Sequence, residues 1–253
     1  MIAADGVRAP ADGLSIRNAP LILMYHAIAE ATEDPNKLCV PPARFAEQMA
    51  WIDRRGLKGV SIGTLIEALR TGRHRRMVGI TFDDGYTNVL EAAVPVLQRH
   101  RFGATAFIIS DRLGATNEWD EGPAWPLLDA DGVRELAGAG IEIGSHGATH
   151  MRLAGANATQ LATEVGASRV RLSTLVGAEI RGFAYPYGSM DAAARRAVCE
   201  AGYEYACAVE TRMNEIGLMA LPRIYAGSRD DATRMTVKRL LYRGYIAVRG
   251  RHE

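Results

Sequence analysis

Apolar runs of strand length alternate along this chain with longer segments in which apolar side chains recur at helical spacing. The runs that predict strands are 21–26, 77–82, 104–109, 141–145, 182–186, 205–209 and 221–226. The segments that predict helices are 42–56, 62–69, 88–100, 131–138, 157–176, 190–201 and 231–242. This alternation favours a parallel α/β sheet that closes, or nearly closes, into a barrel.

Polar residues follow several of the predicted strands, and one connection is unusually long. In folds of this kind, catalytic and binding groups lie where strands end and loops begin. The segment 111–128 contains Gly, Asn, Pro and two Trp residues and predicts a long loop. Loops of this length in compact domains often have a function.

The composition fits one globular domain. The chain has 253 residues, of which 48% are apolar and 23% charged. We expect residues 1–18 to form a flexible N-terminal arm and residues 19–253 to form a single domain. The 30 Lys and Arg residues nearly balance the 29 Asp and Glu residues, so the overall charge gives no reason to expect a nucleic acid or an anionic membrane as partner. The segment 234–251 is locally basic, and it is either a solvated face or tail or a contact for an anionic surface or glycan.

Other features bear on chemistry and location. The three cysteines, Cys39, Cys199 and Cys207, are odd in number and lack CxxC spacing, which argues against a disulfide framework and a thiolate zinc site. The N-terminus has no basic region followed by an apolar run, and no segment is apolar enough to cross a membrane. Taken literally, this predicts a cytoplasmic protein. A periplasmic or envelope-associated protein that had lost its leader would look the same.

The segment ITFDDG places two adjacent carboxylates, Asp83 and Asp84, between an apolar strand and the glycine Gly85. Two like charges at the rim of a core are costly unless a cation or a proton lies between them. The alternative is a simple Asp-Gly turn in which Asp84 caps the next element.

The segment GSHGATH places two histidines, His146 and His150, four residues apart after a predicted strand. If the segment forms one helical turn, both imidazoles face the same side and reach one metal ion. The alternative is a pair of ordinary polar loop residues.

Together the two segments offer Asp84, His146 and His150 as one oxygen and two nitrogen ligands. Three protein ligands with open positions are typical of catalytic metal sites. This ligand set suits Zn²⁺ and also Co²⁺, Ni²⁺, Mn²⁺ or Fe²⁺. Asp83 would then be free to act as a general base.

A third segment, GFAYPYG, places Tyr187 in a turn between Pro186 and Gly188. A backbone N–H fixed there could stabilise a developing oxyanion. Alone this signal is weak, because proline and glycine mark turns in most proteins.

The order TFDDG, SHGATH and FAYPYG resembles the polysaccharide deacetylase family, whose catalytic module is the NodB homology domain of carbohydrate esterase family 4. The resemblance covers about residues 20–226. It implies a distorted (β/α) barrel, a divalent metal that is often zinc, and a substrate with N-acetylated amino sugars. By position in the motifs, it implies that Asp83 is the base, that Asp84, His146 and His150 are the ligands, and that Tyr187 supplies the oxyanion donor.

Two departures from the family pattern concern the residues that assist the base and the leaving group. Ala184 stands where members carry an arginine that orients the base, and no Leu-x-x-His motif follows His150. His26, at the end of LILMYH, is our candidate general acid, since this arrangement resembles the branch that deacetylates poly-N-acetylglucosamine. Arg223, in LPRIY, is the candidate replacement for the missing arginine. The alternatives are a core histidine and a structural salt bridge.

Three functions therefore remain open. The first is hydrolysis of N-acetyl groups on an oligo- or polysaccharide. The second is a related metal-dependent amidase or deformylase acting on another amide, and the third is a glycan-binding module without catalysis. In the long loop, Trp119 and Trp125 would either stack against sugar rings or hold the loop in place.

Overall fold

The computed structural model describes residues 19–209 and 217–249, and within them the strands form one sheet. Every ladder between these strands is parallel. The strands are β1 (Ile22–Tyr25), β2 (Lys58–Val60), β3 (Met77–Phe82), β4 (Thr105–Ile108), β5 (Glu142–Ser145), β6 (Gly182–Ala184), β7 (Tyr205–Ala208), β8 (Leu221–Pro222) and β9 (Ile224–Tyr225). Along the sheet their order is β8-β7-β6-β5-β4-β3-β1-β9, with β2 paired to β3.

The two ends of this order meet at Arg223. β8 pairs with β7 at one edge and β9 pairs with β1 at the other, while only Arg223 separates β8 from β9. The predicted continuous strand 221–226 is therefore wrong in one respect, because it is split where the chain passes from one edge to the other. This split brings the two edge strands next to each other in the chain, so the sheet nearly closes, and the prediction of a distorted (β/α) barrel is confirmed.

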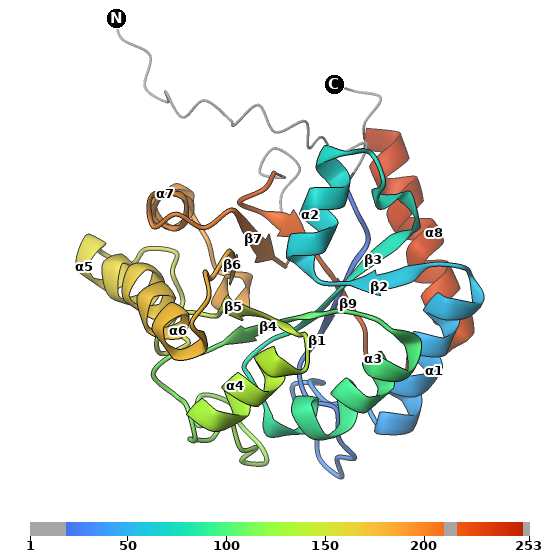
Figure 1. Ribbon diagram of the computed structural model, residues 1–253, viewed down its shortest axis with the longest axis horizontal. Helices are drawn as coiled ribbons and strands as arrows, with labels where there is room; N and C mark the ends of the chain where they lie inside the picture. Colours follow the sequence, from blue (N-terminus) through green and yellow to red (C-terminus); the bar gives the residue numbers. More distant parts are fainter. Residues whose placement is uncertain (1–18, 210–216, 250–253) are drawn as a thin grey trace, which may run out of the picture.

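Helices surround the barrel, with α1, α3 and α8 on one side and α5, α6 and α7 on the other (Figure 1). The α-helices are α1 (Pro42–Arg54), α2 (Ile62–Arg70), α3 (Val94–His100), α4 (Ala130–Gly138), α5 (Ala158–Leu161), α6 (Ser168–Val176), α7 (Ala192–Glu200) and α8 (Ala232–Arg249). Short π-helices, η3 (Val89–Ala93) and η4 (Ala162–Ala167), precede α3 and α6. Two 3₁₀ turns are η2 (His74–Arg76) and η5 (Pro186–Gly188).

The apolar spacing seen in the sequence explains how α1 packs. Phe45, Met49 and Ile52 are fully buried against the barrel. The ring of Phe45 lies 5.2 Å from that of Tyr25 and 5.8 Å from that of Phe82, measured between centroids. These contacts fix the carboxyl ends of β1 and β3 relative to each other, where the polar residues of interest follow.

Several element boundaries differ from the prediction. β2 was not predicted, because it has three residues and includes Gly59, whose closeness to Ile80 and Phe102 leaves no room for a side chain. The predicted helix 157–176 is interrupted by the π-helix η4, and the predicted strand 182–186 ends at Ala184. The terminal helix extends to Arg249 rather than ending at 242.

The structure bears only in part on the predicted N-terminal arm and on the prediction that no segment crosses a membrane. The proposed N-terminal arm, 1–18, lies outside the described residues. Among residues 19–209 and 217–249, no helix has both the length and the apolar character needed to cross a membrane.

Candidate metal centre and active site

A cavity of about 230 Å³ opens at the carboxyl ends of the strands. Parallel strands bring their carboxyl ends to the same side of the barrel, so segments that are distant in sequence meet there. The cavity is lined by Met24, His26, Leu38, Asp83, Asp84, Asp120, His146, His150, Tyr185, Tyr187, Gly188 and Val209. Arg223 is the one predicted site residue that does not line it, and it lies behind Asp83.

The three predicted metal ligands converge in this cavity. Asp84 Oδ1 lies 3.4 Å from His146 Nε2 and 3.3 Å from His150 Nε2. One potential ligand atom from each residue lies within 4.8 Å of the others, and all three residues are buried. Ligands held tetrahedrally at about 2.0–2.1 Å from a zinc ion are about 3.3 Å apart, so the observed separations fit a first-row divalent cation.

The hydrogen bonds around the candidate ligands leave His146 Nε2 and Asp84 Oδ1 available to bind a metal ion. His146 Nδ1 lies 2.8 Å from the carbonyl oxygen of Ala184, to which it would donate, so Nε2 keeps its lone pair for a metal. Among the described residues, Asp84 Oδ1 has no hydrogen-bond partner although it is buried. A buried carboxylate oxygen without a partner is costly, and a cation at this point would satisfy it. The donor set therefore fits a divalent metal ion.

The two histidines approach each other through a loop, not through the helical turn considered for the sequence. Residues 146–150 have no helical structure, and His150 and Gly147 have φ values of 69° and 85°. A side chain at Gly147 would lie only 2.9 Å from a carboxylate oxygen of Glu164. The i, i+4 spacing therefore predicted correctly that the two imidazoles lie close together, but the helical turn assumed for it is wrong.

Glu164 holds this loop in place from the π-helix η4. Its buried carboxylate accepts hydrogen bonds from the backbone N–H of Ala148 at 2.8 Å and of Thr149 at 3.0 Å, and from the Thr149 hydroxyl at 2.6 Å. One side chain therefore ties down the segment between the two imidazoles. Sequence reasoning missed Glu164, because most of its partners are backbone groups that no motif spells out. A π-helix within a longer helix is a frequent marker of functional positions.

Asp83 turns away from Asp84 and pairs with Arg223. Arg223 Nη1 and Nη2 donate to the two carboxylate oxygens of Asp83 at 2.6 and 2.7 Å, and both side chains are buried. Arg223 also donates to the hydroxyl of Thr81 at 3.1 Å. Burial alone would raise the pKa of Asp83, but the nearby charges of Arg223 and His146 outweigh it and lower the pKa below its ordinary value.

His26 stands at the cavity directly after β1. The backbone N–H of Asp83 donates to the carbonyl of Tyr25 at 3.0 Å, which fixes the position of Asp83 beside that of His26. His26 is partly exposed to the cavity, and its Nδ1 has no hydrogen-bond partner among the described residues. A core histidine held by the backbone would have such a partner.

Tyr187 forms one edge of the cavity. It adopts a φ of 57°, and its ring packs 4.5 Å from that of His150 between centroids. The guanidinium of Arg152 lies 4.1 Å from the centre of the Tyr187 ring. Trp119 from the long loop packs 4.6 Å from His150. The candidate ligand His150 thus packs against two aromatic rings.

The family model described as polysaccharide deacetylase matches residues 70–206, which is more than half of the chain. The chain belongs to the polysaccharide deacetylase family. The matched segment contains the DDG, HGATH and YPYG motifs, and it contains neither His26 nor Arg223.

Individual members of the family align over most of the chain. YxkH of Bacillus subtilis (strain 168), a provisionally named polysaccharide deacetylase, is 28% identical over 207 residues, which cover 80% of this chain and 70% of that protein. The poly-beta-1,6-N-acetyl-D-glucosamine N-deacetylase of Staphylococcus aureus (strain MSSA476) is 23% identical and covers 88% of this chain and 83% of that protein.

Solved structures of the family share the fold. The Streptococcus pyogenes deacetylase PplD, solved with acetate, superposes with a TM-score of 0.74 at 22% identity, over 86% of this chain and 96% of that one. IcaB from Ammonifex degensii gives a TM-score of 0.72 at 20% identity, over 87% and 96%.

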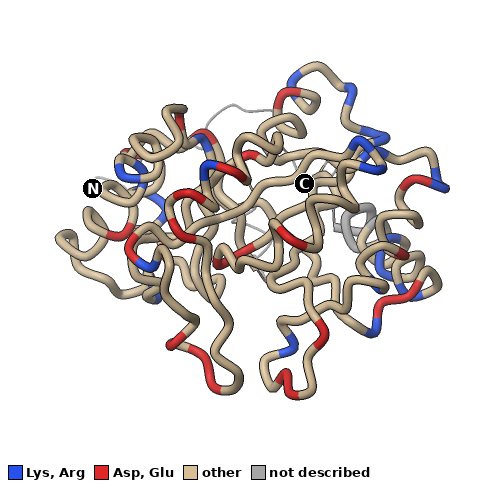
Figure 2. Tube along the Cα trace, turned by 60° about the horizontal axis from the view of Figure 1, so that its bottom comes forward, with Lys and Arg blue, Asp and Glu red and all other residues tan. Residues whose placement is uncertain are grey.

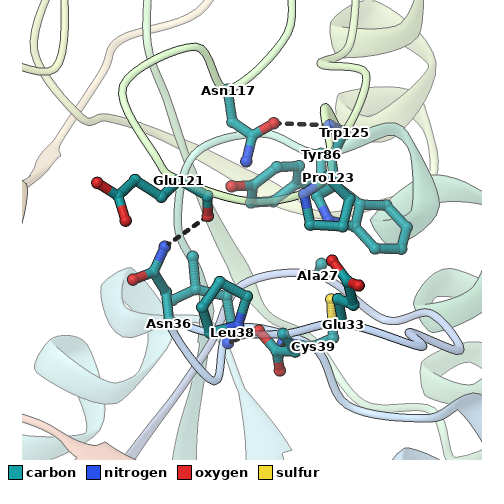
Figure 3. Close-up of a pocket in the computed structure, with 12 residues that line it drawn as sticks. Ala27, Glu33, Asn36, Leu38, Cys39, Tyr86, Asn117, Glu121, Pro123 and Trp125 are labelled. Atoms are coloured by element: carbon teal, nitrogen blue, oxygen red, sulfur yellow. Dashed lines mark hydrogen bonds between the residues drawn. The ribbon is translucent and has the colours of Figure 1, made fainter.

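Two loops, residues 27–39 and 117–125, border the cavity that contains Asp83 and Asp84, and they contact each other. Figure 3 shows a smaller pocket between residues 27–39 and 117–125, where the side chain of Asn36 donates to the carbonyl of Glu121 at 3.3 Å. Asn117 braces the second loop by accepting from the backbone N–H of Trp125 at 2.6 Å. Leu38 lines both this pocket and the catalytic cavity. The backbone of Trp125 takes part in this bracing, and the two roles considered for its ring stay predictions.

Asp120 is a second residue that sequence reasoning missed. It comes from the long loop and lines the cavity together with His26 and Tyr187. Burial and the charge of Asp84 raise the pKa of its carboxyl above the ordinary value. The predicted length of the loop was the one signal that pointed to it.

Proposed function

We propose that this chain is a divalent-metal-dependent N-deacetylase that removes acetyl groups from N-acetylated amino sugars in an oligo- or polysaccharide. The observation that supports this most strongly is the convergence of Asp84, His146 and His150 beside a second carboxylate, Asp83, that is held apart from them. A glycan-binding module has no need for a second buried carboxylate, oriented by Arg223, next to three potential metal ligands.

The side chains would divide the work as follows. A divalent cation held by Asp84, His146 and His150 would polarise the acetamide carbonyl and favour deprotonation of water. Asp83 would accept the proton of the attacking water, and Arg223 would keep Asp83 ionised and oriented. His26 would donate a proton to the departing amine. Zn²⁺ is the first candidate ion, with Co²⁺, Ni²⁺, Mn²⁺ and Fe²⁺ as alternatives.

The walls of the cavity suit an acetyl group. The backbone N–H of Tyr187 belongs to the turn at its edge and is our candidate oxyanion donor. Met24, Leu38 and Val209 contribute apolar surface, which would accommodate a methyl group and gives no advantage to a formyl group. Because Staphylococcus aureus relatives are named for poly-beta-1,6-N-acetyl-D-glucosamine, the β-1,6-linked polymer is the first substrate to test.

The experiment is an acetate-release assay on β-1,6- and β-1,4-linked N-acetylglucosamine oligomers, with and without a chelator. We expect release by the wild type that the chelator abolishes and added metal restores. Asp83→Asn should lower kcat on the order of a hundredfold to ten-thousandfold while leaving metal content unchanged.

The rival functions give different results in the same assay. Formate release from an N-formyl substrate without acetate release from its N-acetyl counterpart would indicate a deformylase. Binding of oligomers by the metal-loaded wild type without any turnover would indicate a glycan-binding module.

A further inference from the structure

We propose that the outer face of the C-terminal helix α8 docks on an anionic lipid surface. This goes beyond the proposed hydrolysis and uses a part of the barrel away from the catalytic cavity. Figure 1 shows α8 along the outside of the barrel, next to α1.

The inner face of α8 is fixed to the barrel. Met235 is 2% exposed, and the hydroxyl of Thr236 accepts a hydrogen bond from the indole N–H of Trp51 at 3.1 Å. Lys238 pairs with Asp230, and Tyr242 donates to the carbonyl of Pro20 at 2.8 Å. The orientation of the helix is therefore set, and its opposite face is held toward the outside.

That opposite face is apolar over more than one helical turn. Val237, Leu240 and Leu241 are 47%, 62% and 68% exposed, and they occupy positions i, i+3 and i+4. Of the five large apolar side chains that are exposed among the described residues, these three share one helix. Such a stripe on the surface of a folded domain marks an interaction site.

The charge around the stripe favours an anionic partner. α8 contains five Lys and Arg residues and no Asp or Glu; of these cations, Lys238 is paired with Asp230 on the inner face, and Arg234 is exposed one turn before the stripe. Arg55, the residue directly after α1, donates to Thr236, which adds another cation beside the helix. In Figure 2, Lys and Arg are frequent on the right of the molecule, with Asp and Glu among them, and this is the side on which Figure 1 shows α1 and α8. A helix with an apolar stripe flanked by cations is typical of segments that lie in a membrane interface.

Two other occupants fit these observations less well. A second copy of this chain placed face to face on α8 would bring two helices without acidic residues together, and their cations would repel. A protein partner would need a groove that matches one convex helix on the side of a barrel. A lipid surface deforms around such a helix and supplies negative charge at its rim.

The test is sedimentation of the full chain with vesicles of phosphatidylcholine alone, or of phosphatidylcholine with an equal part of phosphatidylglycerol. We expect the wild type to sediment with the mixed vesicles, to ignore the neutral ones, and to be released as salt is raised. Val237→Glu should weaken binding about tenfold, and Leu240→Glu with Leu241→Glu about a hundredfold.

A matched control is available on the other side of the molecule. Val170 on α6 is 66% exposed, so Val170→Glu makes the same chemical change away from α8. Binding by Val170→Glu should equal that of the wild type. Acetate release from soluble oligomers should be unchanged in all of these variants, which separates this proposal from the proposed function.

Three results would overturn the proposal. The first is that the folded wild type does not sediment with the mixed vesicles. Equal loss of binding in Val170→Glu and Val237→Glu is the second. The third is a wild-type dimer that Val237→Glu converts to a monomer without vesicle binding, since a second copy would then be the occupant.

Discussion

Both ends of the barrel carry charged side chains, partly buried at the amino ends and buried at the carboxyl ends, and the two ends differ in what those charges contact. At the amino ends of the strands, Glu142 accepts hydrogen bonds from the hydroxyl of Thr105 at 2.7 Å and the backbone N–H of Gly63 at 2.9 Å. Nearby, Arg181 donates to both carboxylate oxygens of Glu204. These charges are neutralised or hydrogen-bonded within the protein.

At the carboxyl ends, the protein leaves hydrogen-bonding capacity unused. Among the described residues, Asp84 Oδ1 and the Nδ1 atoms of His26 and His150 are buried without partners. The backbone is strained at the same place, since Asp84, His150 and Tyr187 have φ values of 72°, 69° and 57°. The difference indicates that one end is built for stability and the other for a ligand that the protein itself does not supply.

We expect the largest effect on activity from a substitution of Asp84, the candidate ligand carboxylate at the carboxyl ends of the strands. Asp84→Asn is the best substitution, because asparagine tolerates the positive φ that alanine would strain. We expect kcat/KM to fall on the order of a thousandfold or more and metal content to drop in parallel. The unfolding midpoint of the metal-free protein should change little. A variant with full metal content and activity would contradict the assignment of Asp84.

The next effect concerns His26. His26→Gln should lower kcat on N-acetylglucosamine oligomers about a hundredfold, since the departing amine needs a proton. With para-nitrophenyl acetate, whose leaving group needs none, the same variant should lose less than about threefold. Equal losses on both substrates would show that His26 is not the acid.

A smaller effect is expected at Glu164, which supports the ligands without contacting them. Glu164→Gln replaces an acceptor of three hydrogen bonds with an amide that also presents N–H groups. We expect metal affinity to fall about tenfold to a hundredfold and kcat by a similar factor once metal is saturating. The visible spectrum of the Co²⁺ protein should change, and unchanged Co²⁺ affinity and spectrum would make the role of Glu164 purely structural.

We expect the smallest effect on activity from a substitution at the amino ends of the strands. Glu142→Gln leaves the site untouched, so kcat/KM should stay within about twofold of the wild type. The free energy of unfolding should fall by about 1–3 kcal/mol, measured by chemical denaturation, because a satisfied charged acceptor is lost. A large loss of activity at constant stability would mean that the two ends are coupled.

The alternation of strands and helices was sufficient to predict the barrel, since it depends on many residues at once. The short strand β2 and the split at Arg223 were not predictable, because two or three residues give no periodicity. The π-helix η4 was also invisible, because its apolar spacing looks like that of an ordinary helix.

For the site, the sequence pointed to residues with unusual chemistry in compact motifs. Asp83, Asp84, His146 and His150 stood out in this way, whereas Glu164 and Asp120 did not. Their contributions depend on where a loop and a helix end up in space. His26 and Arg223 fall between these cases, because each was inferred from a departure from the family pattern.

The central claim is that Asp84, His146 and His150 bind one divalent cation between them. It is tested most directly by a crystal structure of the Zn²⁺-loaded protein, with anomalous diffraction measured above and below the zinc absorption edge. We expect one peak about 2.0–2.2 Å from a carboxylate oxygen of Asp84 and from Nε2 of both His146 and His150. A protein saturated with zinc that shows no peak there, or a peak bound by other residues, would contradict it.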